Sequence, residues 1–277
     1  MTPDQYCHQK ASASGSSFYY SFLFLPPERR RAITALYAFC REVDDIVDEY
    51  GDLEIAHAKL AWWRGEVDSL FAGEPHHPVS RALAPALKPY GIAARHLHDI
   101  IDGMEMDLGT VRFADFAALE RYCYRVAGVV GLLAAGIFGY RDSRTLEYAK
   151  RLGIAFQLTN IIRDIGEDAR RNRIYLPADD LQRFGVPAAD ILAARPSDAF
   201  TRLMQSQTER AREFYRAAFD ALPAADRRAQ RPGLIMAAIY RALLDEIEAE
   251  GFKVLTQRTS LTPLRKLWIA WKTLVAA

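Results

Sequence analysis

Apolar side chains recur every three or four residues along most of this chain, which is the spacing of one face of an α-helix. The pattern is clearest over residues 27–48, where Pro27 and Glu28 open the segment as the first residues of a helix commonly do. The apolar stripe of that segment consists of Ile33, Leu36, Tyr37, Cys40, Val43 and Val47. No stretch alternates apolar and polar residues as a half-buried strand would. The sequence therefore predicts an all-α fold.

The same periodicity predicts further helices, separated by turn-forming residues such as Gly73 and Pro75. These helices cover residues 53–71, 78–88, 93–108, 113–138, 143–169, 187–192, 198–221 and 232–250. No internal repeat, low-complexity tract or linker interrupts the series. A chain of 277 residues with this organisation is expected to form a single domain over residues 1–277.

Charge and cysteine content narrow the classes of function. The formal net charge is +1, so we expect no nucleic-acid partner. Cys7, Cys40 and Cys123 form neither a CxxC pair nor a metal-ligand spacing, which favours reduced thiols and a cytoplasmic location. The longest apolar stretch, residues 126–140, contains four glycines and falls short of the ~20 residues that a membrane span needs. We therefore do not expect an integral membrane protein.

An acidic motif ends the first long helix. Asp44 and Asp48 are one helical turn apart and face the same way, whereas Asp45 points to another side. Two like charges at this spacing destabilise an isolated helix, and both lie on or beside the apolar stripe. The motif is therefore either an acidic helix end open to water or one half of a cation site.

A second acidic motif repeats this spacing on another long helix. Asp164 and Asp168 are again one turn apart, with Gln157 and Asn160 upstream on the same face. Gly166 lies between them, which indicates either a close backbone approach or a frayed helix end. Two such motifs in an all-α protein predict an oxygen-rich cage for Mg²⁺, for which Mn²⁺ would substitute, completed by substrate phosphates.

The chain resembles the squalene/phytoene synthase family over nearly its whole length. The matching motifs are SSFYYSF at 16–22, LPPERRR at 25–31, YAFCR at 37–41, DDIVD at 44–48, YCY at 122–124, VAG at 126–128, QLTNIIRDIGED at 157–168 and RIYLP at 173–177. The serine-rich start and the residues of the first aspartate motif are most similar to those of bacterial presqualene diphosphate synthases of hopanoid biosynthesis. The resemblance implies an isoprenoid-synthase fold with a central cavity, polar at the aspartate end and apolar below.

The resemblance also implies a role for particular residues. The metal ligands would be Asp44, Asp48, Asn160, Asp164 and Asp168, with Gln157 extending the second wall. The phosphate contacts would be Ser17, Arg41, Arg173 and Tyr175, while Gly15 stands where many relatives have a serine. The residues near the reacting carbons would be Tyr37, Tyr122 and Tyr240. Phe18 and Phe22 are either core residues or part of the substrate wall.

The implied activity is the head-to-head condensation of two farnesyl diphosphates to presqualene diphosphate. One substrate would ionise, the C2–C3 double bond of the other would attack the allylic cation, and loss of a proton would close a cyclopropane. The proton acceptor is either a tyrosine or the released diphosphate. No NADPH is expected, because the resemblance to presqualene diphosphate synthases implies a separate reductase. The sequence also contains no GxGxxG fingerprint, although squalene synthases of this family use NADPH without one. The alternatives are a phytoene or dehydrosqualene synthase, a squalene synthase that uses NADPH, and a non-catalytic assembly protein.

Two further segments allow two interpretations each. The acidic run of Asp99, Asp102, Glu105 and Asp107 is an exposed face or a support for the site, and we favour the exposed face. Residues 264–272 are short, basic and aromatic. They form either a helix docked on the domain or a segment that helps the protein rest on the inner face of the cell membrane.

Overall fold

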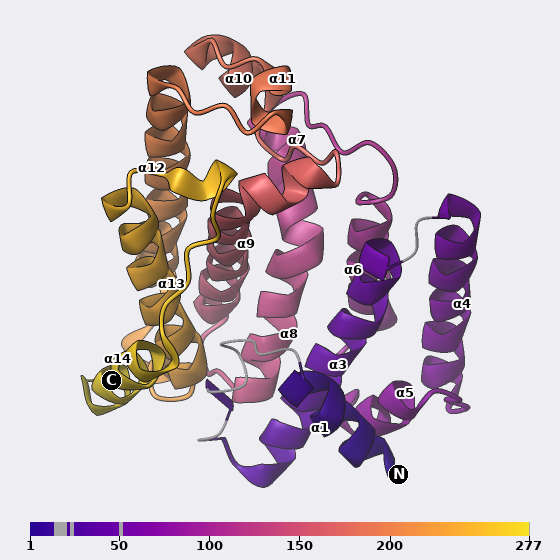
Figure 1. Cartoon of the computed structure of the whole chain (residues 1–277). Helices are drawn as coiled ribbons and strands as arrows, with labels where there is room; N and C mark the ends of the chain where they lie inside the picture. The colour runs from indigo at the N-terminus through magenta and orange to yellow at the C-terminus, as the bar shows by residue number, and fades with distance from the viewer. Residues whose placement is uncertain (14–20, 23–24, 50–51, 277) are drawn as a thin grey trace.

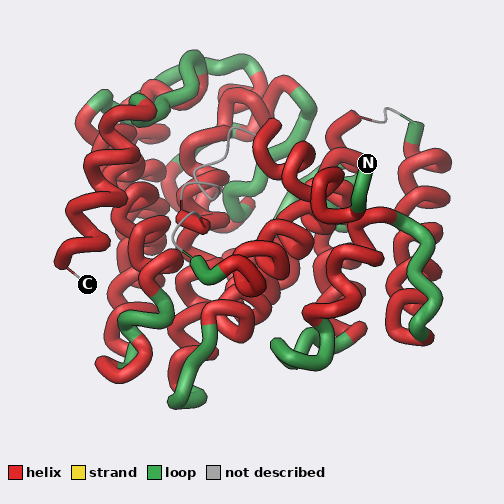
Figure 2. The backbone as a smooth tube through the Cα atoms, turned by 90° about the horizontal axis from the view of Figure 1, so that it is seen from below, coloured by secondary structure: helices red, strands yellow, loops and turns green. Residues whose placement is uncertain are grey.

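The computed structural model describes residues 1–13, 21–22, 25–49 and 52–276. Helices and loops make up this part of the chain, with one isolated parallel bridge between Arg112 and Ile174 (Figure 2). The prediction of an all-α fold is therefore confirmed. The first half comprises α1 (Pro3–Ala13), α3 (Pro27–Glu49), α4 (Leu53–Ala72), α5 (Pro78–Leu83), η1 (Ala84–Ala86) and α6 (Ala94–Glu105).

The second half contains the longest described helix, α9, which lies between α8 and α12 in Figure 1. Its elements are α7 (Phe116–Cys123), η2 (Tyr124–Gly128), α8 (Val129–Phe138), α9 (Arg144–Arg170), α10 (Ala178–Phe184), α11 (Ala188–Leu192), α12 (Asp198–Ala221), η3 (Ala224–Asp226), α13 (Arg231–Ala249), η4 (Lys253–Leu255) and α14 (Pro263–Ala276). Helices α10 and α11 lie at the top of Figure 1, and α14 lies at the lower left with the C-terminus.

Most predicted helices are present, and the differences have local causes. The helix predicted over 78–88 ends at Leu83 and continues as a 3₁₀ turn around Pro85, because proline lacks the N–H that would continue an α-helix. The helix predicted from 113 starts at Phe116, where the Asp115 side chain accepts a hydrogen bond from the Ala118 N–H. Helices α1 and α10 were missed because each is short and buries few apolar side chains.

Two hydrophobic clusters form the interior. One cluster surrounds α3 to α6 and α8, and includes Leu36 and Val43 of the predicted stripe. The other surrounds α9, α12 and α13. Tyr124 and Val126 of the π-helical turn η2 pack against both clusters and join them. Between the clusters lies a cavity of about 630 Å³, so the isoprenoid-synthase architecture places its apolar space where the two halves meet.

The turn η2 and helix α8 approach α9 closely because three glycines lie at the crossing. A Cβ on Gly131 would lie 2.3 Å from the Ala149 carbonyl oxygen, and one on Gly153 would lie 2.3 Å from the Ala127 carbonyl oxygen. The same added Cβ on Gly153 would lie 3.0 Å from the Cα of Gly128. These glycines therefore serve the packing of backbone against backbone.

The sequence suggested that the apolar stretch 126–140 is too short to span a membrane, but it belongs to a longer continuous helical run, Phe116–Phe138. By length and composition it is apolar enough to cross a membrane, and 44% of its most apolar window is buried inside the protein. In the fold it packs against α6 and α9 and contributes Leu119, Val129 and Leu133 to the two clusters. It is thus a core helix.

Candidate active site

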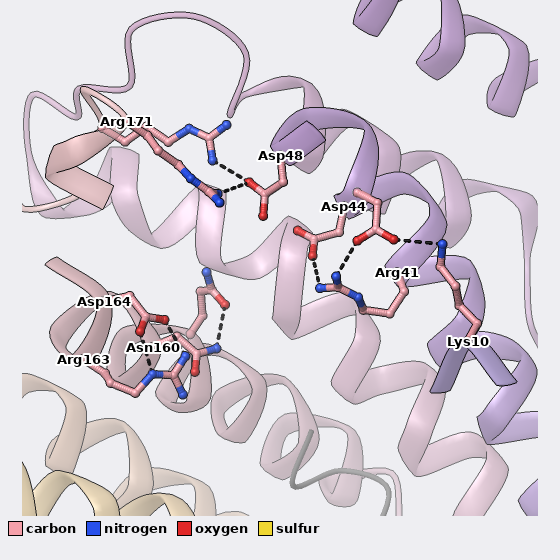
Figure 3. A network of polar contacts seen from close by, with 11 residues as sticks. Lys10, Arg41, Asp44, Asp48, Asn160, Arg163, Asp164 and Arg171 are labelled. Carbon is pink, nitrogen blue, oxygen red and sulfur yellow. Dashed lines mark hydrogen bonds and ion pairs between the residues drawn. The ribbon is translucent and has the colours of Figure 1, made fainter. Parts of the chain in front are cut away.

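The first aspartate motif lies on the cavity side of α3, where basic residues surround it. Asp44 accepts a hydrogen bond from Arg41 at 2.5 Å, and Asp48 accepts one from Arg171 at 2.7 Å and one from Arg173 at 2.9 Å. Arg173 also donates to the Val47 carbonyl oxygen at 2.7 Å. The arginines after the second motif therefore reach across to the first motif, as Figure 3 shows for Arg171.

The second motif lies on α9, on the opposite wall of the cavity (Figure 3). Asp164 accepts hydrogen bonds from Arg163 at 2.7 Å and from Arg258 at 2.8 Å. Asp168 lies one turn further along and lines the same cavity. Among the described residues, the Asp168 carboxylate has no ion-pair partner, although Arg171 and Arg173 are close enough to influence it. The structure thus brings together the four aspartates that the sequence singled out.

Burial and neighbouring charges shift the pKa values of Asp44, Asp164 and Asp168 in different directions. Burial raises the pKa of Asp44 to about 6, and the nearby charges of Asp48 and Asp45 act in the same direction. Burial also raises the pKa of Asp168 to about 7, with a contribution from Asp164. Burial likewise opposes ionisation of Asp164, but hydrogen bonds and charge from Arg163 and Arg258 outweigh it and lower the pKa of Asp164.

The residues present fit Mg²⁺ held jointly by protein and substrate. Within the described residues, no group of three carboxylate, histidine or cysteine side chains converges on one point, so a cage made by protein alone is absent there. Mg²⁺ usually takes one or two carboxylates, several waters and substrate phosphates, which suits two separated aspartate pairs. Asn160 donates to the Gln157 side chain at 3.3 Å, while its Oδ1 is buried without a partner among the described residues. That oxygen is a further ligand of the kind Mg²⁺ prefers.

Asp107 corrects the interpretation of the third acidic run. Its carboxylate is buried and accepts hydrogen bonds from the Tyr122 and Tyr175 hydroxyls, each at 2.7 Å. Burial raises the pKa of Asp107 to about 6, and the two tyrosines oppose this shift. Asp102 and Glu105 instead pair with Arg64, away from this cluster. Asp107 follows α6 rather than continuing its exposed face, and helical spacing alone did not reveal that change of direction.

The predicted substrate residues lie along one cavity with two different ends. Tyr37, Arg41, Tyr122, Gln157 and Tyr240 all line it, together with Phe22. Its apolar part is lined by Ile33, Leu36, Ala134, Phe138, Leu152 and Met236. Ser17 and Phe18, together with Gly15, lie outside the described residues. The described residues thus place the polar and apolar groups as the predicted cavity requires.

Sequence reasoning missed Arg258 and explained Gly166 only in part. A Cβ on Gly166 would lie 2.4 Å from the Leu255 carbonyl oxygen and 2.6 Å from that of Val254. Gly166 therefore allows the segment after α13 to lie directly on α9, which confirms the close backbone approach. The same segment carries Arg258 to Asp164. An isolated arginine far from both motifs gave no signal in the sequence.

The sequence model of squalene/phytoene synthases matches residues 11–265 of this chain. The chain belongs to the squalene/phytoene synthase family. A solved dehydrosqualene synthase in complex with a ligand is 28% identical, with a TM-score of 0.90 over 99% of this chain and 96% of that one. The solved squalene synthase HpnC from Alicyclobacillus acidocaldarius is also 28% identical, with a TM-score of 0.79 over 90% of this chain and 94% of that one. The all-helical isoprenoid-synthase fold of this family member is thereby confirmed.

Curated relatives carry the name phytoene synthase. The chloroplastic phytoene synthase of an Oncidium hybrid cultivar is 37% identical over 267 residues, which cover 94% of this chain and 65% of the plant protein. This family member thus spans slightly less than two thirds of the length of that relative. The phytoene synthase of Arthrospira platensis is 36% identical over 274 residues, covering 94% of this chain and 89% of the relative. The presqualene diphosphate subgroup suggested by the motifs therefore stays a hypothesis.

Proposed function

We propose that this family member joins two molecules of an allylic prenyl diphosphate head to head and releases diphosphate. The observation that carries the proposal is the position of two opposed aspartate pairs, each held by arginines, in a cavity that also has an apolar wall. Such a site suits a substrate with one strongly anionic end and one long hydrocarbon end. Binding of both ends in one cavity would hold the reacting carbon at their boundary.

The first step breaks the bond between C1 of one substrate and its diphosphate oxygen. Negative charge then develops on the leaving group, next to Arg41, Arg171 and Arg173, whose guanidinium groups match phosphate oxygens in geometry. Mg²⁺ bound through Asp44, Asp48, Asn160, Asp164 and Asp168 would supply further neutralisation of the diphosphate. Each of these arginines pairs with an aspartate in the structure, so its charge is already oriented towards the site.

The second step forms carbon–carbon bonds between the two substrates. The C2–C3 double bond of one molecule attacks C1 of the other, and loss of one proton closes a cyclopropane that retains one diphosphate. The protein has to hold two chains side by side and keep water from the cation. The apolar wall formed by residues such as Leu36, Leu152 and Met236 suits both tasks. Asp107 orients the Tyr122 and Tyr175 hydroxyls at the polar end of this space.

We propose C20 substrates, so that loss of the second diphosphate and a further proton yields phytoene. The names of the plant and cyanobacterial relatives support this choice, since both are phytoene synthases at 37% and 36% identity. The second candidate is the condensation of two C15 farnesyl diphosphates to presqualene diphosphate. The observation that favours it is the resemblance to a dehydrosqualene synthase structure that covers 99% of the chain. Neither condensation needs NADPH.

One product analysis distinguishes these candidates. Purified protein is incubated with Mg²⁺ and either the C15 or the C20 diphosphate, each with and without NADPH. Products are identified by mass spectrometry before and after phosphatase treatment, with Asp44→Asn as the inactive control. Phytoene from the C20 substrate supports the first candidate, and presqualene alcohol from the C15 substrate supports the second. Squalene formed only with NADPH would indicate a squalene synthase, and no product in any tube would contradict a catalytic role.

A further inference from the structure

Helix α14 (Pro263–Ala276) packs on the protein by one face only. Ala270 is buried in the second hydrophobic cluster, and Ile269 and Leu274 pack against that cluster. Lys266, on the same side, lines the cavity, and the helix lies against α13. The docked-helix interpretation of residues 264–272 is therefore correct for this inner face. That interpretation does not account for the outer face of α14.

The outer face of α14 is an exposed apolar stripe. Successive helical residues are about 100° apart, so positions 264, 268, 271 and 275 fall on one side, opposite Ala270. Leu264 is 80% exposed, Trp268 60%, Trp271 56% and Val275 70%. The two indole rings stack with centroids 5.2 Å apart, so they form one aromatic surface. We call this set, together with Leu267, the α14 stripe.

The α14 stripe is more than the scattered exposure that any protein shows. Of the twelve large hydrophobic side chains that are exposed among the described residues, five belong to this one helix. Exposing two tryptophans to water is unfavourable, and a contiguous exposed apolar surface commonly marks an interaction site. The described part of the chain offers nothing that covers the stripe.

The charges beside the stripe indicate what covers it. Helix α14 carries Arg265, Lys266 and Lys272 and no acidic residue. Arg265 pairs with Glu246 at 2.5 Å, and Lys272 is exposed. Arg265 and Lys272 are seven residues apart, so both lie along one edge of the stripe. The helix therefore presents an apolar surface with tryptophans and a basic edge.

We propose that the α14 stripe docks on an anionic lipid surface, with Trp268 and Trp271 at the level of the headgroups. Indole rings favour the boundary between lipid and water, and a basic edge is attracted to anionic headgroups. A second copy of the chain fits less well in an antiparallel two-fold interface, because that arrangement would bring the two basic edges together. Since α14 also lines the cavity through Lys266, docking would place one cavity wall against the lipid.

The first test measures binding to vesicles. Full-length protein is sedimented with vesicles of phosphatidylcholine alone or of phosphatidylcholine with phosphatidylglycerol. We expect binding to the anionic vesicles, and a loss of about tenfold or more in partitioning for the double variant Trp268→Ser, Trp271→Ser. The matched control is Trp62→Ser on α4, a tryptophan that is 51% exposed elsewhere and whose replacement should leave binding unchanged. Equal partitioning of the double variant and the control would overturn the proposal.

Two further measurements separate lipid docking from the alternatives. Lys272→Glu should weaken binding to anionic vesicles and added salt should do the same, whereas Lys88→Glu on another surface should have little effect. Brominated lipids should quench the fluorescence of wild-type protein but not that of the double variant. A dimer in solution that the double variant converts to monomer would overturn the proposal in favour of self-association. The binding assay needs no substrate, so its failure would leave the proposed condensation unaffected.

Discussion

The Tyr122 hydroxyl donates a hydrogen bond to Asp107 at 2.7 Å, and both groups are buried beside the cavity. Tyr175 donates to the other oxygen of the same carboxylate at 2.7 Å. One carboxylate thus orients two tyrosines that come from distant parts of the chain. The rings of Tyr122 and Tyr175 also contact each other, with centroids 5.3 Å apart. Asp107 is therefore a positioning residue for the polar end of the cavity.

Asp107→Asn tests this positioning role. The amide keeps the shape of the carboxylate but has only one oxygen, so one tyrosine loses its acceptor. We expect turnover to fall at least about tenfold, because a misplaced group near the reacting carbons raises the barrier. Steady-state kinetics should show the loss in kcat, with unchanged circular dichroism. Tyr122→Phe and Tyr175→Phe identify which hydroxyl matters, and wild-type turnover in Asp107→Asn would contradict the role.

The aspartate pairs are tested by Asp44→Asn and Asp168→Asn. Each change removes one charge from a group of half-buried carboxylates, so the fold should survive with similar or greater thermal stability. Turnover should fall at least about a hundredfold, because charge neutralisation of the leaving group is lost. The check is a product assay beside a thermal melt, with Mg²⁺ and diphosphate present or absent. We expect these ligands to stabilise the wild type more than either variant. Near-normal activity in both variants would exclude a Mg²⁺ site shared by these aspartates and the substrate.

Gly166→Ala tests the contact between α9 and the segment that carries Arg258. The new methyl group would meet two backbone carbonyl oxygens closer than 3 Å, so that segment must shift. We expect a destabilisation of about 1–3 kcal/mol, together with reduced activity. The matched control is Gly65→Ala within α4, where a Cβ meets nothing within 4 Å. It should stabilise by up to about 1 kcal/mol. Chemical denaturation measures both, and equal effects would contradict the close approach.

Asp226 provides a prediction about pH. Its buried carboxylate accepts hydrogen bonds from the Arg141 and Asp142 N–H groups and from Thr145, just before and within the first turn of α9. Burial opposes ionisation, but these hydrogen bonds outweigh it and lower the pKa of Asp226. Because the folded pKa is the lower one, the stabilisation is complete above the unfolded pKa of about 3.9 and is lost as the pH falls through the folded pKa.

Asp226→Asn should therefore destabilise the protein by about 1–3 kcal/mol at pH 7. The difference from wild type should shrink as the pH falls below about 4. Denaturation curves at several pH values check this, with Asp220→Asn on the exposed side of α12 as a control that should leave stability unchanged. A difference that is constant with pH would show that the ionised carboxylate is not the stabilising form.

Local spacing identifies some residues of the core and the site but not others. Leu36 and Val43 were correctly predicted to be core residues, because the spacing of apolar side chains along one helix depends only on nearby residues. Asp44, Asp48, Asp164 and Asp168 were recognised because each pair lies within one helical turn. Asp107 was assigned to an exposed face and Arg258 was not recognised, since their partners lie far away in the sequence. Only the path of the chain after α6 and after α13 brings them to Tyr122 and Asp164.

The sequence by itself determined the helices and the residues that face one way along each of them. Both follow from spacing within a few residues, and family motifs added the expected site. The tertiary structure alone decided that Asp107 is buried between two tyrosines, that Arg171 and Arg173 reach across to Asp48, and that α14 leaves two tryptophans exposed. The physical reason is the same in each case. Whether a side chain is buried or paired depends on which surfaces of the protein meet, and the packing of helices that are distant in the sequence determines those surfaces.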